Sequence, residues 1–250
     1  MITTKVRYRE LVGSLLRCSV AVVRRPGRAT IEDVLNQLWI VGVQAVPLVG
    51  VITFFVGYVL AMVLYIQLSR LSLGGRLPGF LWVMLTEQIV PLTVSMIIIG
   101  RSVSSLTAEL GSMQVSEEIK ALHTMGIDVT AFLLWPRFIC FLLAGPALTL
   151  IGVYAALAGG YSFCGFAQSM SPSGYFDAAL ESSEMSSLWL ALGKAVVFSF
   201  LAVIIALRRG LNVREGSREI SEATTSAVVT SVVAVTLSNA ALTTLQLFGA

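Results

Sequence analysis

The sequence predicts an all-α, polytopic membrane protein with an N-terminal interfacial elbow helix and five transmembrane helices. Two observations predict this class. Of the 250 residues, 56% are hydrophobic and only 12% are charged, with a mean hydropathy of +0.85, whereas a soluble domain carries about 25% charged residues. Several apolar runs also reach the roughly 20 residues that a helix needs to cross a hydrocarbon core of about 30 Å.

The first 46 residues are expected to form amphipathic and interfacial helices. Arginine and lysine are scattered as far as Arg28 around a short apolar patch, without a small-residue cleavage site. This pattern is typical of a helix lying on a membrane surface and not of a cleaved signal peptide. Thr30 can cap a second helix, which we expect to bend near Pro47 into the first crossing.

Residues 47–250 are predicted to form a transmembrane domain of five crossings. The apolar runs place them at about 47–69, 79–103, 137–164, 187–207 and 222–247. Two polar segments interrupt these runs: 104–135 lies between the second and third crossings, and 165–186 between the third and fourth. Five crossings put the two ends of this domain on opposite sides of the membrane.

Basic residues choose the sides, because cytoplasmic loops carry an excess of lysine and arginine. Only Arg70 and Arg76 fall on one side, while Lys194 falls inside the fourth crossing. The other side holds Lys5, Arg7, Arg9, Arg17, Arg24, Arg25, Arg28, Arg101, Lys120, Arg137, Arg208, Arg209, Arg214 and Arg218. We therefore expect a cytoplasmic N-terminus, a cytoplasmic 104–135 segment, an outer 165–186 loop and a C-terminus on the outer side, which is the periplasm in a bacterial inner membrane.

Small residues recur every four positions in two crossings, a spacing that lets helices approach closely in lipid. The third crossing has Gly152, Ala156 and Gly160, for which we expect packing within the chain. The fifth has Ser226, Thr230, Ala234 and Ser238, which fit either packing within the chain or a subunit interface.

The segment EEIKALHTMGID, residues 117–128, is a charged helix-forming stretch between two apolar runs. Ile119, Leu122 and Met125 share one helical face, Ser116 can cap the start, and Gly126 suits the end. Tied at both ends to crossings, such a helix can pass force between the membrane part and a soluble partner. It can equally rest on lipid headgroups.

Residues 100–138 resemble the signature region of the MlaE/YrbE permease family, the membrane subunits of ABC systems that move lipids with MCE proteins. The similarity covers nearly all of the chain after about residue 30, and departs from the family pattern at Glu87, Gln88 and Val103. The matching positions are Gly100, Arg101, Ser104, Ala108, Glu109, Gly111, Met113, Glu117, Glu118, Ile119, Ala121, Leu122, Met125, Gly126, Ile127, Asp128, Pro136 and Arg137.

The resemblance implies a permease subunit that moves phospholipid or a related lipid between the bacterial inner membrane and an MCE-protein conduit. It implies five crossings with an interfacial elbow helix, and a cytoplasmic coupling helix that docks on a separate ABC ATPase. The residues assigned to that contact are Glu109, Glu117, Glu118, Lys120, Met125, Gly126 and Asp128.

The resemblance also implies partners and the source of energy. We expect a second permease chain, as a homodimer or a heterodimer, an MCE-domain protein and a small regulatory subunit on the ATPase. This chain is expected to bind no cofactor, because ATP and magnesium belong to the ATPase, and to bind no nucleic acid.

A lipid cavity is predicted near the middle of the membrane and its outer half, lined by Leu60, Leu64, Tyr65, Glu87, Gln88, Leu92, Met96 and Leu245. Glu87 is an ionisable group in an apolar crossing, which is costly and marks a candidate functional residue. It can face a headgroup in the cavity or pair with Lys194. Pro91 removes a backbone hydrogen bond nearby and can open a kink there.

The sequence argues against catalysis by this chain. His123 is the only histidine and lacks neighbours at metal-ligand spacing; Gly193-Lys194 lacks the glycine of a P-loop. We therefore predict a transport subunit and no enzyme. The alternatives are a non-transporting scaffold, or degenerate partner chain, that anchors MCE and ATPase subunits, and an intramembrane lipid enzyme, which the missing acid–base groups disfavour.

Overall fold

The computed structural model describes residues 31–70, 76–126, 129–168, 171, 174–175, 177, 185–213 and 216–249. The predicted amphipathic helix before residue 29 lies outside these ranges, as do Asp128 and most of the 165–186 loop. The elements are α2 (Ile31–Val41), the 3₁₀ turn η1 (Val43–Ala45), α3 (Val46–Arg70), α4 (Leu77–Met84), the π-helical turn η3 (Leu85–Ile89), α5 (Val90–Ile98), the π-helical turn η4 (Ile99–Val103), α6 (Ser104–Val115), α7 (Glu118–Thr124), the π-helical turn η5 (Thr130–Leu134), α8 (Trp135–Gln168), α10 (Met185–Leu211) and α11 (Gly216–Gly249).

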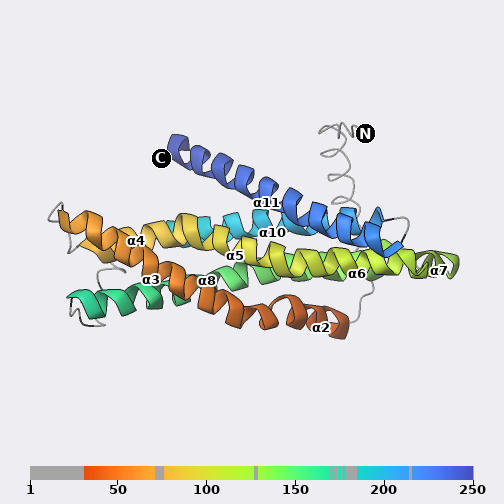
Figure 1. Ribbon diagram of the computed structural model, residues 1–250, viewed down its shortest axis with the longest axis horizontal. Coiled ribbons are helices and arrows are strands. Elements are labelled where there is room, and N and C mark those ends of the chain that lie inside the picture. The colour runs from red at the N-terminus through yellow and green to blue at the C-terminus, as the bar shows by residue number, and fades with distance from the viewer. Residues whose placement is uncertain are drawn as a thin grey trace.

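Five helical paths in the described residues are long and apolar enough to cross a membrane, which confirms the predicted class. They are α3, the continuous path from α4 to α6, α8, α10 and α11 (Figure 1). The second crossing is predicted to end near residue 103, and the helix itself continues beyond that point. Ser104 to Val115 continue it as α6, because the polar side chains there do not interrupt helical hydrogen bonding.

The alternating directions of the five paths bring the basic residues to one end. Arg137 starts α8, Arg208 and Arg209 end α10, and Arg218 lies in the first turn of α11. All of these helix ends lie toward α6 and α7 in Figure 1, whereas Arg70 ends α3 at the opposite end. The fold therefore has a basic end and an opposite end that is poor in basic residues.

The helices α3 and α8 pack closely against each other. A Cβ atom at Gly57 would overlap the backbone carbonyl of Ala156, and one at Gly159 would overlap that of Phe54. Only glycine permits such an approach, which compensates in lipid for the missing hydrophobic drive between helices. Gly152, Ala156 and Gly160 are all buried within the chain, which confirms packing as their role.

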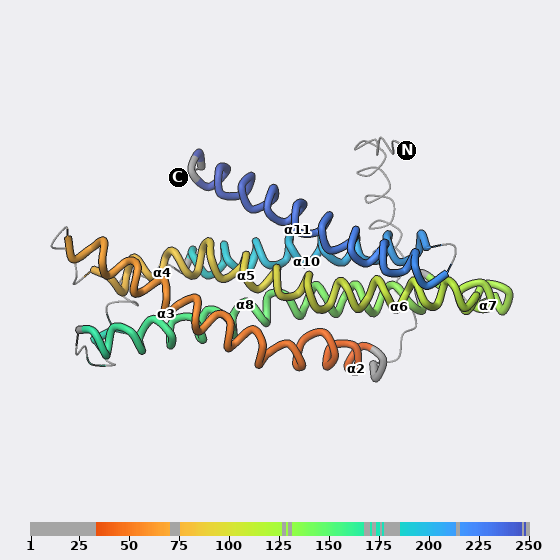
Figure 2. Tube along the Cα trace, viewed as in Figure 1, coloured from red at the N-terminus to blue at the C-terminus, as the bar shows by residue number. Residues whose placement is uncertain are grey.

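The helix α11 is the least covered of the five. In its most apolar stretch 11% of residues are buried, against 61% in α10. Its C-terminal half diverges from the other helices (Figure 2). Ser226, Thr230, Ala234 and Ser238 are half-buried toward the chain, and Arg209 donates to Thr230 at 3.4 Å, so this stripe packs at least in part within the chain.

The helix α2 meets α3 through the 3₁₀ turn η1, directly before Pro47. The α-helix is thus interrupted where the bend is predicted. The Gly42 N–H donates to the Leu38 carbonyl and Ala45 to Gly42, which closes α2 before α3 begins. At 25 residues, α3 alone rises about 38 Å and can cross the hydrocarbon core without α2.

Candidate functional site

The segment predicted to contact an ATPase lies at the far end of the path from α4 to α6. The helix α7 follows α6 after a turn and forms one tip of the molecule (Figure 1). It has no buried residue. Met125 is 69% exposed, and Ile119 and Leu122 are half-exposed, so the predicted apolar face exists and the described residues leave it largely uncovered.

The two ends of α7 differ from the prediction. Ser116 was expected to cap the helix, but the N-cap is Glu117, with a left-handed φ of 60° and no side-chain cap. The Glu117 carboxylate instead accepts from Lys120 at 2.6 Å, and this hydrogen bond lowers the pKa of Glu117 below its ordinary value of 4.5. Gly126 ends the helix with a φ of 74°, as predicted, because glycine tolerates this conformation.

Glu109 lies apart from the other residues assigned to the coupling contact. It sits in α6, and its carboxylate accepts from Arg137 at the start of α8 at 2.5 Å. Glu118 and Lys120, by contrast, are exposed on α7. The structure therefore places Glu117, Glu118, Lys120, Met125 and Gly126 at the tip, while Glu109 joins two crossings below it.

Lys194 stands at the centre of a second group of polar residues, inside the membrane-spanning part. The side chain is 3% exposed. Its ammonium donates to the backbone carbonyl of Glu87 at 2.9 Å, to Gln88 Oε1 at 3.2 Å and to Thr243 Oγ1 at 3.4 Å. Thr243 in turn donates to Gln88 Oε1 at 3.0 Å. This Lys194 cluster joins three crossings.

Pro91 explains why the Glu87 carbonyl needs a lysine. In a regular α-helix that carbonyl accepts from the N–H of residue 91, four positions later, and proline has none. The backbone there forms the π-helical turn η3, in which Val90 donates to Leu85. The Lys194 ammonium supplies the missing donor at a depth where water cannot.

Glu87 and Lys194 are neighbours, but they do not form the ion pair considered above. The Glu87 carboxylate accepts from the buried Ser187 hydroxyl at 2.7 Å, and the described residues show no salt bridge between Glu87 and Lys194. Glu87 itself is half-buried, so the described residues do not enclose it completely.

The apolar residues of the predicted lipid cavity lie in separate settings within one chain. Leu60 and Ile89 line an open apolar groove of about 570 Å³ along the outer face of α3. Leu64 and Tyr65 follow one turn later, with Tyr65 edge-on to Phe163 at a centroid distance of 5.8 Å. One residue of the groove, Ile89, follows Gln88 of the Lys194 cluster in the sequence.

The remaining predicted cavity residues are dispersed. Leu92 and Met96 are half-buried on α5, whereas Leu245 is 68% exposed near the end of the diverging α11. Gln88 and Thr243 do bring the second and fifth crossings together. A single chain therefore supplies parts of a cavity wall, and these parts do not close around one space.

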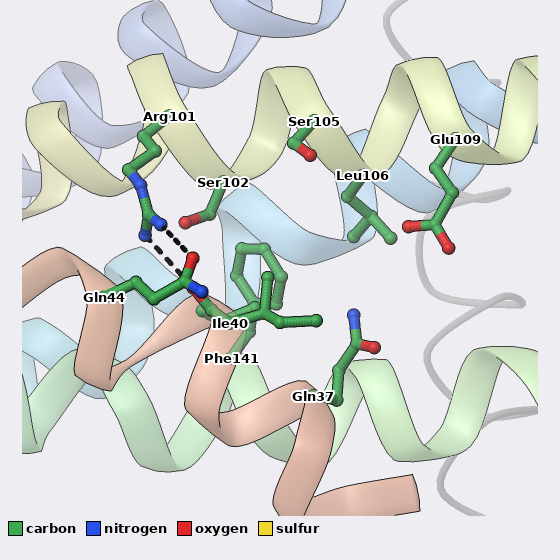
Figure 3. Close-up of a pocket in the computed structure, with 10 residues that line it drawn as sticks. Gln37, Ile40, Gln44, Arg101, Ser102, Ser105, Leu106, Glu109 and Phe141 are labelled. Atoms are coloured by element: carbon green, nitrogen blue, oxygen red, sulfur yellow. Dashed lines mark hydrogen bonds between the residues drawn. The ribbon is translucent and has the colours of Figure 1, made fainter.

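A smaller cavity of about 210 Å³ lies at the basic end, between α2, η4, α6 and α8 (Figure 3). Its polar lining comprises Gln37, Gln44, Arg101, Ser102, Ser105 and Glu109. Arg101 donates to the carbonyl of Ile40 at 3.1 Å and to Gln44 Oε1 at 2.9 Å. These bonds fasten the end of α2, where helix carbonyls lack partners within the helix.

Sequence reasoning missed several of these contacts. One signal in the sequence could have indicated the lysine–carbonyl bond. Pro91 lies four residues after Glu87, and an unpaired lysine follows two crossings later. Ser187 and Thr243 gave no comparable signal, since hydroxyl groups are common in crossings and usually bond within their own helix.

Comparison with known proteins identifies a family of membrane permeases that this chain resembles. The family model described as "Permease MlaE" matches residues 34–245. A probable ABC transporter permease protein of Rickettsia conorii is 32% identical over 242 residues, which cover 96% of this chain and 93% of that protein. The intermembrane phospholipid transport system permease protein MlaE of Haemophilus influenzae is 29% identical over 197 residues, covering 78% and 75%. The chain therefore belongs to the MlaE permease family.

Proposed function

We propose that the chain is the permease subunit of an ABC transporter that moves phospholipid between the inner membrane and an MCE-protein conduit. ATP and magnesium are bound by a separate cytoplasmic ATPase, which docks on α7 and can carry a small regulatory subunit. The membrane and family assignments support the general role, and the Haemophilus relative is named for phospholipid transport.

The observation that supports the coupling role most directly is the continuity of the path from α4 to α7. The second crossing continues without a break into α6, and α7 follows after a two-residue turn. Movement of the tip is therefore transmitted to η3 and the Lys194 cluster by a packed helix. The uncovered Leu122 and Met125 give a soluble partner an apolar contact.

The orientation follows from the charges. The basic end, with α7, faces the cytoplasm by the positive-inside rule, and the C-terminus of α11 faces the periplasm. The exposed apolar faces of α3 and α11 then suit lipid or a second permease chain. We propose that two chains together close the cavity whose walls one chain supplies only in part.

The test isolates the tagged chain from its native membrane and measures ATP-dependent phospholipid transfer between vesicles. Leu122→Asp places a charge on the apolar face of α7 and should remove the ATPase and abolish transfer. His123→Asp, next to it and on a more exposed face, is the matched control and should retain both. Co-purification of the ATPase equally with both variants would contradict docking on this face.

A second experiment distinguishes a lipid transporter from a non-transporting scaffold. Leu64→Trp adds bulk to the predicted lipid cavity, far from α7, and should lower transfer severely in a complex that still assembles. Unchanged transfer in that complex would contradict the predicted cavity. A wild-type complex that holds ATPase and MCE subunits but transfers no lipid would instead favour the scaffold.

A further inference from the structure

The cavity at the basic end contains polar donors for which the described residues provide no acceptor. An arginine side chain has five N–H donors, and Arg101 uses two, toward Ile40 and Gln44. The other three have no acceptor among the described residues.

The two serines of this cavity behave differently from their neighbours. Ser104 donates to the Gly100 carbonyl at 2.6 Å, and Thr107 to Val103 at 2.8 Å, the usual bonds of such side chains within a helix. Ser102 and Ser105 form no hydrogen bond in the part of the chain that the structure describes. Ser102 is only 6% exposed, so an unpartnered hydroxyl points into the cavity from a buried position.

The cavity lies at the level of lipid headgroups. From Leu77 to Ile98 the second crossing rises about 33 Å, which matches a hydrocarbon core of about 30 Å. Arg101 follows within one turn. Trp39, on the neighbouring α2, is 57% exposed, and tryptophan is enriched at this depth in membranes.

We propose that this cavity binds the headgroup phosphate of a phospholipid in the leaflet at the basic end. The free N–H donors of Arg101 and the hydroxyls of Ser102 and Ser105 would hold the phosphate oxygens, since guanidinium suits phosphate geometrically and electrostatically. The volume of about 210 Å³ is ample, because one water needs only about 10–15 Å³ of such space.

Glu109, at the far end of the cavity, determines which type of headgroup the site prefers. Glu109 lies one helical turn beyond Ser105, roughly 6 Å along the axis, and its carboxylate keeps acceptor capacity beyond the bond to Arg137. A cationic amine two carbons from the phosphate reaches it, whereas a neutral glycerol group gains no ionic contact. The site therefore favours a zwitterionic ethanolamine phospholipid over an anionic glycerol one.

This site lies outside the predicted transport cavity, and its existence requires neither an ATPase nor transfer of lipid. A bound lipid would fasten α2 to η4, α6 and α8, which all contribute to the cavity. Failure of the site would leave the proposed transport function intact, and failure of that function would leave the site intact.

The test uses the full-length chain in mild detergent and a phosphatidylethanolamine that carries a photoreactive group on its acyl chain close to the glycerol. Mass spectrometry locates the labelled peptides and gives the labelling yield. We expect label on peptides from 31–45 or 100–110. Unlabelled phosphatidylethanolamine should compete, with phosphatidylglycerol weaker by about tenfold and inorganic phosphate without effect at millimolar concentration.

The decisive variant is Ser102→Ala with Ser105→Ala. It removes two hydroxyls that bond nothing in the described structure, so the fold should be retained, and the lipid affinity should fall about tenfold or more, as expected for hydrogen bonds to a charged group. Ser104→Ala is the matched control, because its hydroxyl bonds within its own helix, and should label like the wild type. Glu109→Gln should bring the two lipids to equal affinity.

Two outcomes would overturn the proposal. Equal labelling of these peptides in the double serine variant and in Ser104→Ala would show that the hydroxyls hold no phosphate. Competition by inorganic phosphate as effective as that by phosphatidylethanolamine would show that the site takes free phosphate and not a lipid. A preference for phosphatidylethanolamine that survives Glu109→Gln would overturn the role of that carboxylate.

Discussion

Two lysines in this molecule mark opposite ways of using charge. Lys120, on α7, has a side chain that is 67% exposed and pairs with the equally exposed Glu117 at 2.6 Å. Lys194, in α10, is 3% exposed and holds three neutral oxygens, of Glu87, Gln88 and Thr243. The first lysine lies beyond the crossings, and the second lies inside them.

The difference shows where stability and partner binding reside. An exposed ion pair contributes little, because water and salt screen it. Inside the membrane every polar group must find a partner within the protein, and an unpaired group is costly. We therefore expect the Lys194 cluster to maintain the fold, and the tip to be free to serve as a contact surface.

Removing the buried lysine should have the largest effect. Lys194→Met deletes the donor that Pro91 cannot provide and leaves the Glu87 carbonyl buried without a partner. We expect the free energy of unfolding to fall by about 2 kcal/mol, the cost of such an unsatisfied group. Denaturant titration of the purified chain in micelles, followed by circular dichroism, measures it.

The exposed Lys120 provides a control for this prediction, and Pro91 provides a second variant that should restore stability. Lys120→Met makes the same chemical change at the tip and should leave the unfolding midpoint unchanged. Pro91→Ala restores an N–H four residues after Glu87, so it should recover part of the loss when combined with Lys194→Met, a non-additive result. Equal unfolding midpoints for Lys194→Met and Lys120→Met would contradict the claim that the buried lysine stabilises the fold and the exposed one does not.

The sequence predicted the parts of the fold that depend on composition and periodicity. The crossings, the bend before α3 and the Gly126 end of α7 all follow from apolar length or from glycine and proline rules. The helical form of residues 104–115 was not predicted, because that segment is polar. Hydropathy indicates which residues can cross a membrane, and it does not indicate where a helix ends.

The candidate sites were less predictable, because they depend on which side chains meet. Glu87 and Lys194 were recognised as costly charges, but the pairing of Lys194 with a carbonyl depends on the rotation of three helices. Arg101 and Glu109 appeared only as motif positions. That they line one cavity with two unpartnered serines is visible only once α2 is placed against them.

A smaller effect is expected at the start of α7. Glu117 adopts a left-handed φ of 60°, which is unfavourable for any residue with a Cβ. Glu117→Gly removes that strain, at the cost of a more flexible unfolded chain. Amide hydrogen exchange across residues 118–126 should slow by about threefold, because the first effect exceeds the second.

Glu117→Ala separates backbone strain from charge. It keeps the Cβ atom and deletes the contact with Lys120, so hydrogen exchange should not slow. If alanine slowed exchange as much as glycine, the left-handed turn would not be the source of strain, and the carboxylate itself would be unfavourable at this position.

The smallest effect concerns pH. Because the hydrogen bond from Lys120 lowers the pKa of Glu117 below 4.5, the ionised carboxylate favours the folded tip above that value. The contribution is lost as pH falls through the lowered pKa. The carboxyl carbon resonance of Glu117 should titrate below 4.5 in the wild type and return to about 4.5 in Lys120→Met.

High salt should narrow the difference between the two pKa values, since both groups are exposed. A wild-type midpoint already at 4.5 would mean that Lys120 does not hold Glu117. Lys120 would then be available to an acidic partner surface, and the tip would differ even more from the buried cluster.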